Sequence, residues 1–104
     1  MNLEALYAGL KIIAPAAYRV FKTKQSSPYI IYYIESNDRD ASDDGSVATY
    51  DKSLVIELYT TQKDIDLERR VEALLAPYSF TCYEQWIESE QKLMNAYTVE
   101  IFEK

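Results

Sequence analysis

The sequence predicts an α+β domain: a mostly antiparallel sheet of four to five strands with two helices packed on one face. Two segments carry apolar residues at helical spacing. Several shorter segments are rich in β-branched and aromatic residues and are bounded by turn residues. The loops between consecutive strands are short, which favours antiparallel pairing. The predicted order along the chain is helix, strand, strand, strand, helix, strand, strand.

The beginning of the chain predicts a helix followed by a short strand. Asn2 is suited to cap the helix, whose apolar side chains form one stripe. This stripe consists of Leu3, Leu6, Tyr7, Leu10 and Ile13. Pro15 ends the helix, because the residue before a proline is pushed out of helical geometry. Residues 17–21 have the composition of a short strand, and residues 25–28 predict a turn.

Two strands and an acidic loop are predicted next. Residues 29–34 are all apolar or aromatic, so both faces of this strand lack charge. Residues 36–46 are rich in Asp, Ser and Asn and predict a loop. Residues 53–60 predict a strand that we expect to be central in the sheet. One of its faces carries Leu54, Ile56 and Leu58, and the other carries Val55, Glu57 and Tyr59.

A second helix and a closing pair of strands complete the prediction. Thr61 followed by Asp64 resembles a capping box, so we expect a helix that begins at Thr61 and ends before Pro77. Its apolar stripe consists of Leu67, Val71, Leu74, Leu75 and Tyr78. The remaining segments are a strand at 80–88, a turn at 89–91 and a last strand at 93–102.

The composition limits the functions that the chain can perform. Its 104 residues suggest one domain, residues 1–104. The net charge of −6 argues against binding nucleic acid through its phosphates. No apolar run approaches the roughly 20 residues of a membrane span, and the beginning lacks the pattern of a secretory signal. We therefore expect a cytoplasmic product that neither reads nucleic-acid sequence nor enters a membrane.

Catalysis and cofactor binding are poorly supported by the residue content. The chain has no histidine, which is the commonest general base and metal ligand. Its two glycines provide no phosphate-binding loop. The single cysteine, Cys82, lies in an aromatic segment, and we expect it to be buried as a small hydrophobic residue. We expect no enzyme activity, no catalytic residue and no cofactor.

One acidic segment has the spacing of a calcium-binding loop. Asp40, Ser42, Asp44 and Gly45 occupy the first, third, fifth and sixth places of an EF-hand pattern. The twelfth place is Asp51 rather than the usual glutamate, and strands rather than helices are predicted on both sides. We therefore favour a solvated acidic loop that binds no metal.

Two further charged groups have a functional and a structural interpretation. Glu57, Glu84 and Glu88 would form a set of paired carboxylates only if the fold brought them together, and exposed strand faces often carry such residues. Glu57 lies between Val55 and Tyr59, which indicates a wet or interfacial strand face. The basic cluster of Arg19, Lys22 and Lys24 is too small for a nucleic-acid footprint, but it is suited to acidic groups on a neighbouring subunit.

The predicted sheet has more apolar surface than two helices can cover. The strands at 29–34 and 53–60 carry apolar residues on both faces, as strands buried on both faces do. Two helices cover one face of a four-stranded sheet. We therefore expect a partner subunit to cover part of the other face.

The order and spacing of several segments resemble a known family. "IAPAAYRVF", "SPYIIYYIES" before an acidic loop, "KSLVIELYT" with "DLERRVEALL", and a closing aromatic hairpin resemble the small tail-completion or tail-terminator proteins of long-tailed bacteriophages and prophages. The resemblance covers nearly the whole chain and consists of strand and helix patterns rather than invariant chemistry. It implies an α+β fold, a homo-oligomeric ring of about six subunits, and no catalysis.

The resemblance implies a structural role at the head–tail joint. The protein would form a ring at the head-proximal end of the tail tube, where it terminates the tail and joins it to the head. The implied partners are further copies of the chain, the tail-tube protein and a head connector or neck protein. The implied location is the host cytoplasm during assembly and then the tail or neck of the virion. The alternative is a small regulatory or inhibitor domain that binds one partner protein through its sheet face.

The residues expected to contact a subunit or partner come from two regions. They are Asp38, Arg39, Asp40, Asp43 and Asp44 in the acidic loop, and Val55, Glu57 and Tyr59 on the second face of the central strand. These positions are physical inferences, because the family pattern transfers no functional residue one by one.

Overall fold

The first helix begins and ends at the residues that the sequence indicates. In this computed structural model, which describes residues 2–37 and 51–102, helix α1 spans Leu3–Ile13. The Asn2 side chain caps it by accepting a hydrogen bond from the Ala5 N–H at 3.1 Å. Ala14 leaves helical geometry directly before Pro15, as the steric effect of a proline on the preceding residue requires.

The second helix begins later than predicted. Helix α2 spans Ile65–Leu75, and its cap is Asp64 rather than Thr61. The Asp64 carboxylate accepts a hydrogen bond from the Leu67 N–H at 3.1 Å. Asp64 was expected to lie three residues after the cap, as the last residue of the capping box, but its carboxylate is itself a strong acceptor for a free N–H group. The prediction of Thr61 as the cap is therefore wrong.

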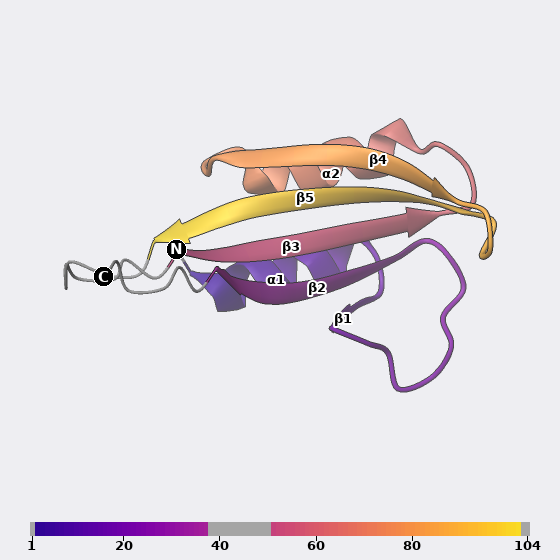
Figure 1. The fold of residues 1–104 in the computed structure, drawn as a ribbon, viewed down its shortest axis with the longest axis horizontal. Coiled ribbons are helices and arrows are strands. Elements are labelled where there is room, and N and C mark those ends of the chain that lie inside the picture. The colour runs from indigo at the N-terminus through magenta and orange to yellow at the C-terminus, as the bar shows by residue number, and fades with distance from the viewer. Residues whose placement is uncertain (1, 38–50, 103–104) are drawn as a thin grey trace.

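A five-stranded mixed sheet confirms the α+β prediction (Figure 1). The strands are β1 Ala16–Tyr18, β2 Tyr29–Asn37, β3 Asp51–Thr60, β4 Phe80–Ile87 and β5 Lys92–Phe102. They lie side by side in the order β1-β2-β3-β5-β4. Strand β1 runs parallel to β2, and every other pair of neighbours is antiparallel. Strand β3 lies in the middle of the sheet, as expected.

The connection through α2 explains why β4 is not beside β3. Both β3 and β4 are antiparallel to β5, so they are parallel to each other. Parallel strands need a crossover connection, which α2 provides. The β4–β5 hairpin then places β5 in the gap between them, and β4 becomes an edge strand of the described sheet.

Two element boundaries differ from the predictions. The loop predicted at 36–46 begins later, because residues 36 and 37 still pair with β3 as part of β2; the rest of this loop lies outside the described residues. The short strand predicted at 17–21 ends at Tyr18. Arg19 has a φ of 66°, a left-handed conformation that cannot continue a strand.

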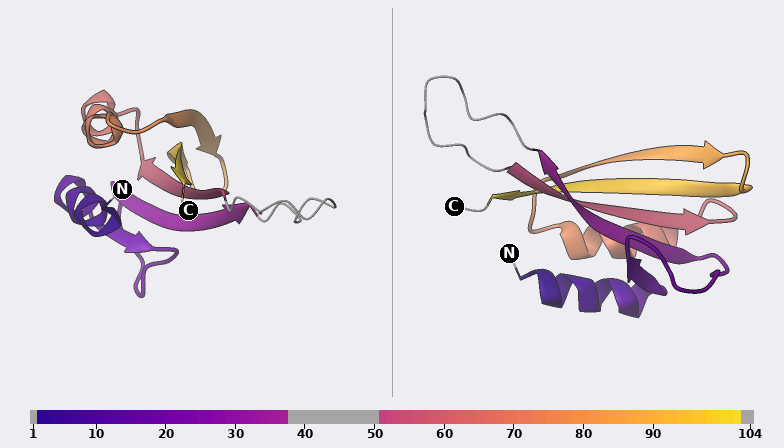
Figure 2. Two further views of the ribbon diagram at one scale, coloured as in Figure 1. Left: turned by 90° about the vertical axis from the view of Figure 1, so that its left-hand side faces the viewer. Right: turned by 60° about the horizontal axis from the view of Figure 1, so that its bottom comes forward.

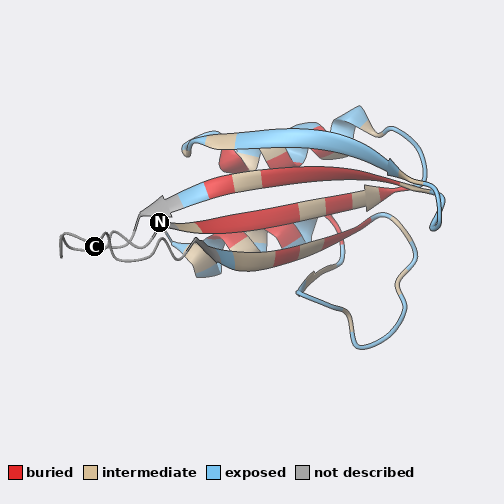
Figure 3. Ribbon diagram, viewed as in Figure 1, coloured by how far each residue is buried: buried red, intermediate tan, exposed pale blue. Residues whose placement is uncertain are grey.

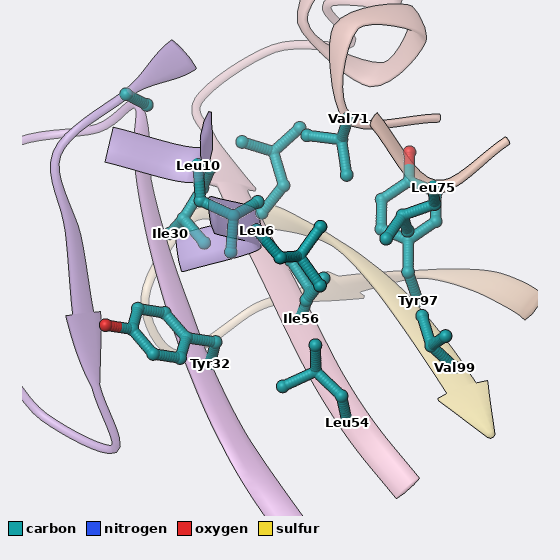
Figure 4. Close-up of a cluster of buried hydrophobic side chains, with 12 residues drawn as sticks. Leu6, Leu10, Ile30, Tyr32, Leu54, Ile56, Val71, Leu75, Tyr97 and Val99 are labelled. Atoms are coloured by element: carbon teal, nitrogen blue, oxygen red, sulfur yellow. The ribbon is translucent and has the colours of Figure 1, made fainter. Parts of the chain in front are cut away.

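Both helices cover the same face of the sheet (Figure 2). The side chains of Leu54, Ile56 and Leu58 on β3 point toward them and are fully buried. Figure 4 shows the cluster that they join, and Figure 3 shows buried residues concentrated in the middle strands. The other members of this hydrophobic cluster are Leu6, Leu10, Ala14, Ile30, Tyr32, Val71, Leu75, Tyr97 and Val99. The predicted division of this strand into two faces is therefore confirmed, and the face with Leu54, Ile56 and Leu58 is the one that points toward the helices.

The two helices contact each other at a glycine. A Cβ atom at Gly9 would lie 2.8 Å from Cδ1 of Leu74 and 3.0 Å from its Cδ2. Leu74 is only half-buried, whereas Val71 and Leu75 on the same helix are fully buried. Leu74 therefore packs against α1, and Val71 and Leu75 carry the contact with the sheet.

The first prediction tests this helix–helix contact. Gly9→Leu should lower the free energy of unfolding by about 1–3 kcal/mol, because the added side chain overpacks the space that Leu74 fills. Combining it with Leu74→Ala should recover part of the loss, giving a coupling energy of about 0.5–3 kcal/mol in a double-mutant cycle.

Urea denaturation of the four proteins measures both quantities. Ala8→Leu is the matched control, because Ala8 is exposed on the same helix. If Gly9→Leu is as stable as Ala8→Leu, the contact between Gly9 and Leu74 is not a tight one.

Candidate interaction surface

No helix covers the sheet face opposite α1 and α2; within the described chain, Phe21 of the β1–β2 connection packs edge-to-face on Tyr29 at one end of it, with ring centroids 5.7 Å apart. We call it the open face; it faces the viewer in Figure 1, with the helices behind. The strand register assigns its residues. They are Tyr29, Ile31, Tyr33 and Glu35 on β2, Ser53, Val55, Glu57 and Tyr59 on β3, Lys92, Met94, Ala96, Thr98 and Glu100 on β5, and Thr81, Tyr83, Gln85 and Ile87 on β4. Most are apolar or aromatic, so this sheet does not show the clean alternation of a half-solvated sheet.

The tyrosine rings on the open face shelter the middle of the sheet. The rings of Tyr29 and Tyr59, which are directly opposite each other on β2 and β3, stack with their centroids 4.9 Å apart. Val55 is only 5% exposed although no helix lies above it. Tyr83 on β4 is 57% exposed. The open face is therefore buried near β3 and exposed toward the β4 edge.

A carboxylate lies in the middle of this aromatic surface. Glu57 accepts a hydrogen bond from the Tyr59 hydroxyl at Oε1, at 2.7 Å, and one from the Tyr33 hydroxyl at Oε2, at 3.2 Å. It is half-buried and lies across from Ile31 on β2 and Ala96 on β5. A carboxylate has about four acceptor positions, so two hydroxyl donors leave room for a further donor.

Both tyrosines remain neutral donors at physiological pH. Burial and the adjacent Glu57 carboxylate raise the pKa of the Tyr33 hydroxyl to about 12. Burial, followed by the hydrogen bond to Glu57, also raises the pKa of Tyr59. The charge of the group is therefore the single negative charge of Glu57, held in place by two uncharged donors.

The residues predicted to contact a partner have different outcomes. Val55, Glu57 and Tyr59 share the open face, and Glu57 and Tyr59 are hydrogen-bonded to each other. The loop residues Asp38, Arg39, Asp40, Asp43 and Asp44 lie outside the described residues, as does most of the calcium-like pattern. Tyr33 belongs to the same hydrogen-bonded group but was not singled out. Only the strand register, which places it beside Val55, reveals its relation to Glu57.

The fold does not bring the three candidate carboxylates together. Glu57 is on the open face, whereas Glu84 lies across from Asn95 on the helix-covered face. Glu88 is in the β4–β5 turn, where it accepts a hydrogen bond from the Trp86 indole N–H at 2.7 Å. Their spacing in the sequence therefore does not create an acid–base pair.

A second charged cluster fastens α2 to β4 and β5. The Lys63 ammonium group contacts Glu68 at 2.8 Å and Glu84 at 2.5 Å. Glu68 is buried, and Asn95 donates a second hydrogen bond to it at 3.3 Å. The two carboxylate partners raise the pKa of Lys63. Because the buried carboxylate of Glu68 is paired with a cation and also accepts from Asn95, this cluster has the character of a structural ion pair.

Cys82 is exposed, so the prediction that it is buried is wrong. Its side chain is on the helix-covered face of β4, where Glu84 and Trp86 are exposed as well. As Figure 3 shows, β4 is exposed along most of its length. The aromatic neighbours in the sequence suggested a core strand, but α2 does not cover the edge of the sheet.

The described residues contain neither a candidate metal site nor a candidate membrane-spanning helix. They contain no group of three or more His, Cys, Asp or Glu side chains that could hold a metal ion. Within the same residues, neither helix has the length and apolar character needed to cross a membrane.

Comparisons with known proteins do not identify a family. The chain matches no protein-family model, and a search of curated proteins finds no relative. The function is therefore inferred from the sequence patterns and from the geometry of the open face.

The second prediction concerns the titration of Tyr33. Because its pKa is raised from 10.0 to about 12, the neutral hydroxyl stabilises the fold below pH 10, and this contribution is lost as the pH rises through 12. Glu57→Gln should lower the pKa of Tyr33 toward 10 without reaching it, since burial remains. Carbon-13 NMR of labelled tyrosines measures this pKa.

Glu4→Gln is the control for this titration, since Glu4 is exposed on α1, on the other side of the sheet. A Tyr33 pKa that is the same in Glu57→Gln and in the unmodified protein would show that the hydroxyl does not contact Glu57.

The third prediction concerns Cys82. A thiol-specific chromogenic reagent should modify one thiol per chain in the folded protein, without denaturant, because the only cysteine is exposed. Cys82→Ser should abolish the signal and leave the melting temperature nearly unchanged. A thiol that reacts only after unfolding would contradict the placement of β4.

Proposed function

We propose that this protein is a structural component of a bacteriophage or prophage tail. Copies of the chain would form a ring at the head-proximal end of the tail tube, where the ring terminates the tail and joins it to the head. The sequence patterns that resemble tail-completion and tail-terminator proteins support this proposal. The α+β fold is the one that the resemblance implies, although a shared fold alone does not establish a function.

The open face is the observation that carries the proposal. It is a continuous sheet surface with stacked tyrosines, a nearly buried Val55 and an exposed Tyr83. Aromatic residues are enriched at protein interfaces, and contiguous apolar surfaces commonly mark them. A subunit that buries this surface against its neighbours would complete the burial that the two helices provide on the other side.

The proposed mechanism is geometric rather than chemical. One side of the ring would bind the last ring of the tail-tube protein and stop further addition, because its opposite side does not present a tube-like surface. That opposite side would then bind a head connector or neck protein. The process needs no catalytic residue, cofactor or nucleic-acid readout, and it would occur in the host cytoplasm before the ring becomes part of the virion.

The same surface also supports a second function. A small regulatory or inhibitor domain would use the open face to bind one partner protein, with Glu57 and its two tyrosines as the polar centre. The sequence patterns that support the tail proposal do not support this alternative, so we place it second. The two proposals differ in what the protein binds, and one experiment separates them.

The fourth prediction tests the tail proposal. The purified protein is mixed with purified tail tubes, and the tube ends are imaged by electron microscopy. The expected result is a ring-shaped density at one end only and no further tube growth when tube subunits are added. Tyr83→Glu should abolish this binding, because it places a charge on the exposed part of the open face.

Ala73→Glu is the matched control, because Ala73 is exposed on α2, on the helix side of the sheet, and both changes add one negative charge. Tube ends that stay bare and continue to grow would exclude the tail proposal. Tight binding to one unrelated host protein under the same conditions would favour the regulatory alternative.

A further inference from the structure

A basic segment extends from one edge of the sheet. Residues 19–25, which we call the basic arm, connect β1 toward β2 and carry Arg19, Lys22 and Lys24, all exposed. In Figures 1 and 2 the loop that contains this arm projects away from the β1 edge. From residue 16 to residue 34 the sequence contains no Asp or Glu. In a chain with a net charge of −6, this is a local reversal of charge.

The basic arm also carries an exposed apolar residue. Val20 is 71% exposed, and the neighbouring Tyr18 is 44% exposed. An exposed valine side chain between cations does not stabilise the isolated fold, because apolar surface stabilises a protein only when it is removed from water. An apolar side chain surrounded by positive charges is suited to a partner surface that is apolar and negatively charged.

The open face is such a surface. Glu35 and Glu100 lie on either side of Ser53 in the register of β2, β3 and β5, at the end of the face opposite Tyr29. Both are exposed. Glu57 adds a third carboxylate, two residues beyond Val55 along β3. Among the described residues of this face, the cation is Lys92. It lies at the opposite end from Glu35 and Glu100, where its ammonium group donates to the Tyr29 hydroxyl at 3.2 Å.

This acidic end of the open face is also hollowed. A depression of about 470 Å³ lies over β3, β4 and β5. Its described lining residues are Ser53, Ser79, Phe80, Thr81, Thr98 and Glu100. A valine side chain is small compared with this volume, so the depression can receive one without a change in the sheet.

We propose that the basic arm of one copy of this chain docks on the acidic end of the open face of a second copy. Val20 enters the depression, while Lys22 and Lys24 face Glu35 and Glu100, and Arg19 approaches the free acceptor positions of Glu57. Charge complementarity within one sequence selects a second copy as the occupant. A different protein with a basic segment would bind the acidic end of the open face but would leave the basic arm of this chain exposed and unbound.

The contact joins two different patches, so it is head-to-tail rather than two-fold. The arm belongs to the β1 edge of the sheet, and the depression lies on the other half of the sheet, over β3, β5 and β4. Each copy can therefore use its arm on one neighbour and its open face on another. Such a contact builds a ring when the rotation closes and a filament when it does not.

This inference rests on the proposed function for its closed geometry, but it is tested without tail tubes. Sedimentation velocity of the isolated protein over a concentration series measures self-association. The expected result is a particle larger than a dimer that forms with a dissociation constant below about 1 mM. A chain that stays monomeric up to that concentration would overturn the proposal.

Charge reversal locates the contact. The arm variant Lys22→Glu/Lys24→Glu and the face variant Glu35→Lys/Glu100→Lys should each weaken self-association at least about tenfold, since each places like charges opposite one another. The control Lys11→Glu/Arg69→Glu makes the same change in net charge as the arm variant, at exposed helix positions, and should associate like the unmodified protein. Circular dichroism melts establish that every variant is folded.

Mixing the two reversed variants gives the decisive result. In an equimolar mixture the acidic arm of one variant meets the basic face of the other, so particles of the original size should return. Variants that associate normally alone, or a mixture that stays monomeric, would overturn the contact. A dimer that survives the arm variant would overturn it as well, because it must use another surface.

The outcomes for this contact and for the proposed function are separate. Head-to-tail particles that ignore tail tubes would support the contact and exclude the tail function. Protein that is monomeric alone but forms rings on tube ends, with the arm variant as active as the control, would support the tail function and exclude the contact.

Discussion

A sheet with two apolar faces and helices for only one of them is the constraint on which this structure depends. The leucines and isoleucine of β3 that point toward α1 and α2 are fully buried. On the other side, the burial of Val55 is achieved by neighbouring side chains, with tyrosine rings stacked across the strands. Tyrosine is suited to this position, because its ring covers apolar surface while its hydroxyl remains hydrogen-bonded. Four of the ten tyrosines, Tyr29, Tyr33, Tyr59 and Tyr83, lie on this face, where their rings cover part of the sheet that no helix covers.

The fold could be predicted because its signals are local and repeated. Apolar stripes gave both helices, and alternation along residues 53–60 gave the two faces of β3 correctly. The errors concern a residue that can serve two local roles and a residue whose burial depends on how the helices pack on the sheet. Asp64 fits a capping box as the partner of Thr61, but its own carboxylate is the cap. Cys82 was expected to be buried because its strand is aromatic, but β4 is an edge strand, and nothing in its composition reveals which strands α2 covers.

The candidate interaction surface was predictable only in part. The position of Glu57 between two apolar neighbours indicated an interfacial face, and the residue indeed lies among tyrosines. Its hydrogen bond to Tyr33 spans 24 residues in the sequence and depends on the register of β2 against β3, which the sequence patterns do not specify. The same is true of the separation of Glu57 from Glu84, because opposite faces of a sheet follow from register as well. The neighbours of Glu57 on the open face could therefore be identified only from the strand pairing, whereas the fold class could be predicted without it.

The exposed edge strand β4 has a consequence for the solubility of the protein. Every second residue of an edge strand directs its N–H and C=O groups away from the sheet, which invites pairing with any other extended chain. The segment from Phe80 to Ile87 is rich in aromatic and β-branched residues and contains a single charged residue, Glu84. The Glu84 carboxylate forms a salt bridge with Lys63, which precedes α2. Glu84 is thus the charged residue within β4 that opposes pairing with another extended chain, and loss of its side chain would favour fibrous aggregation.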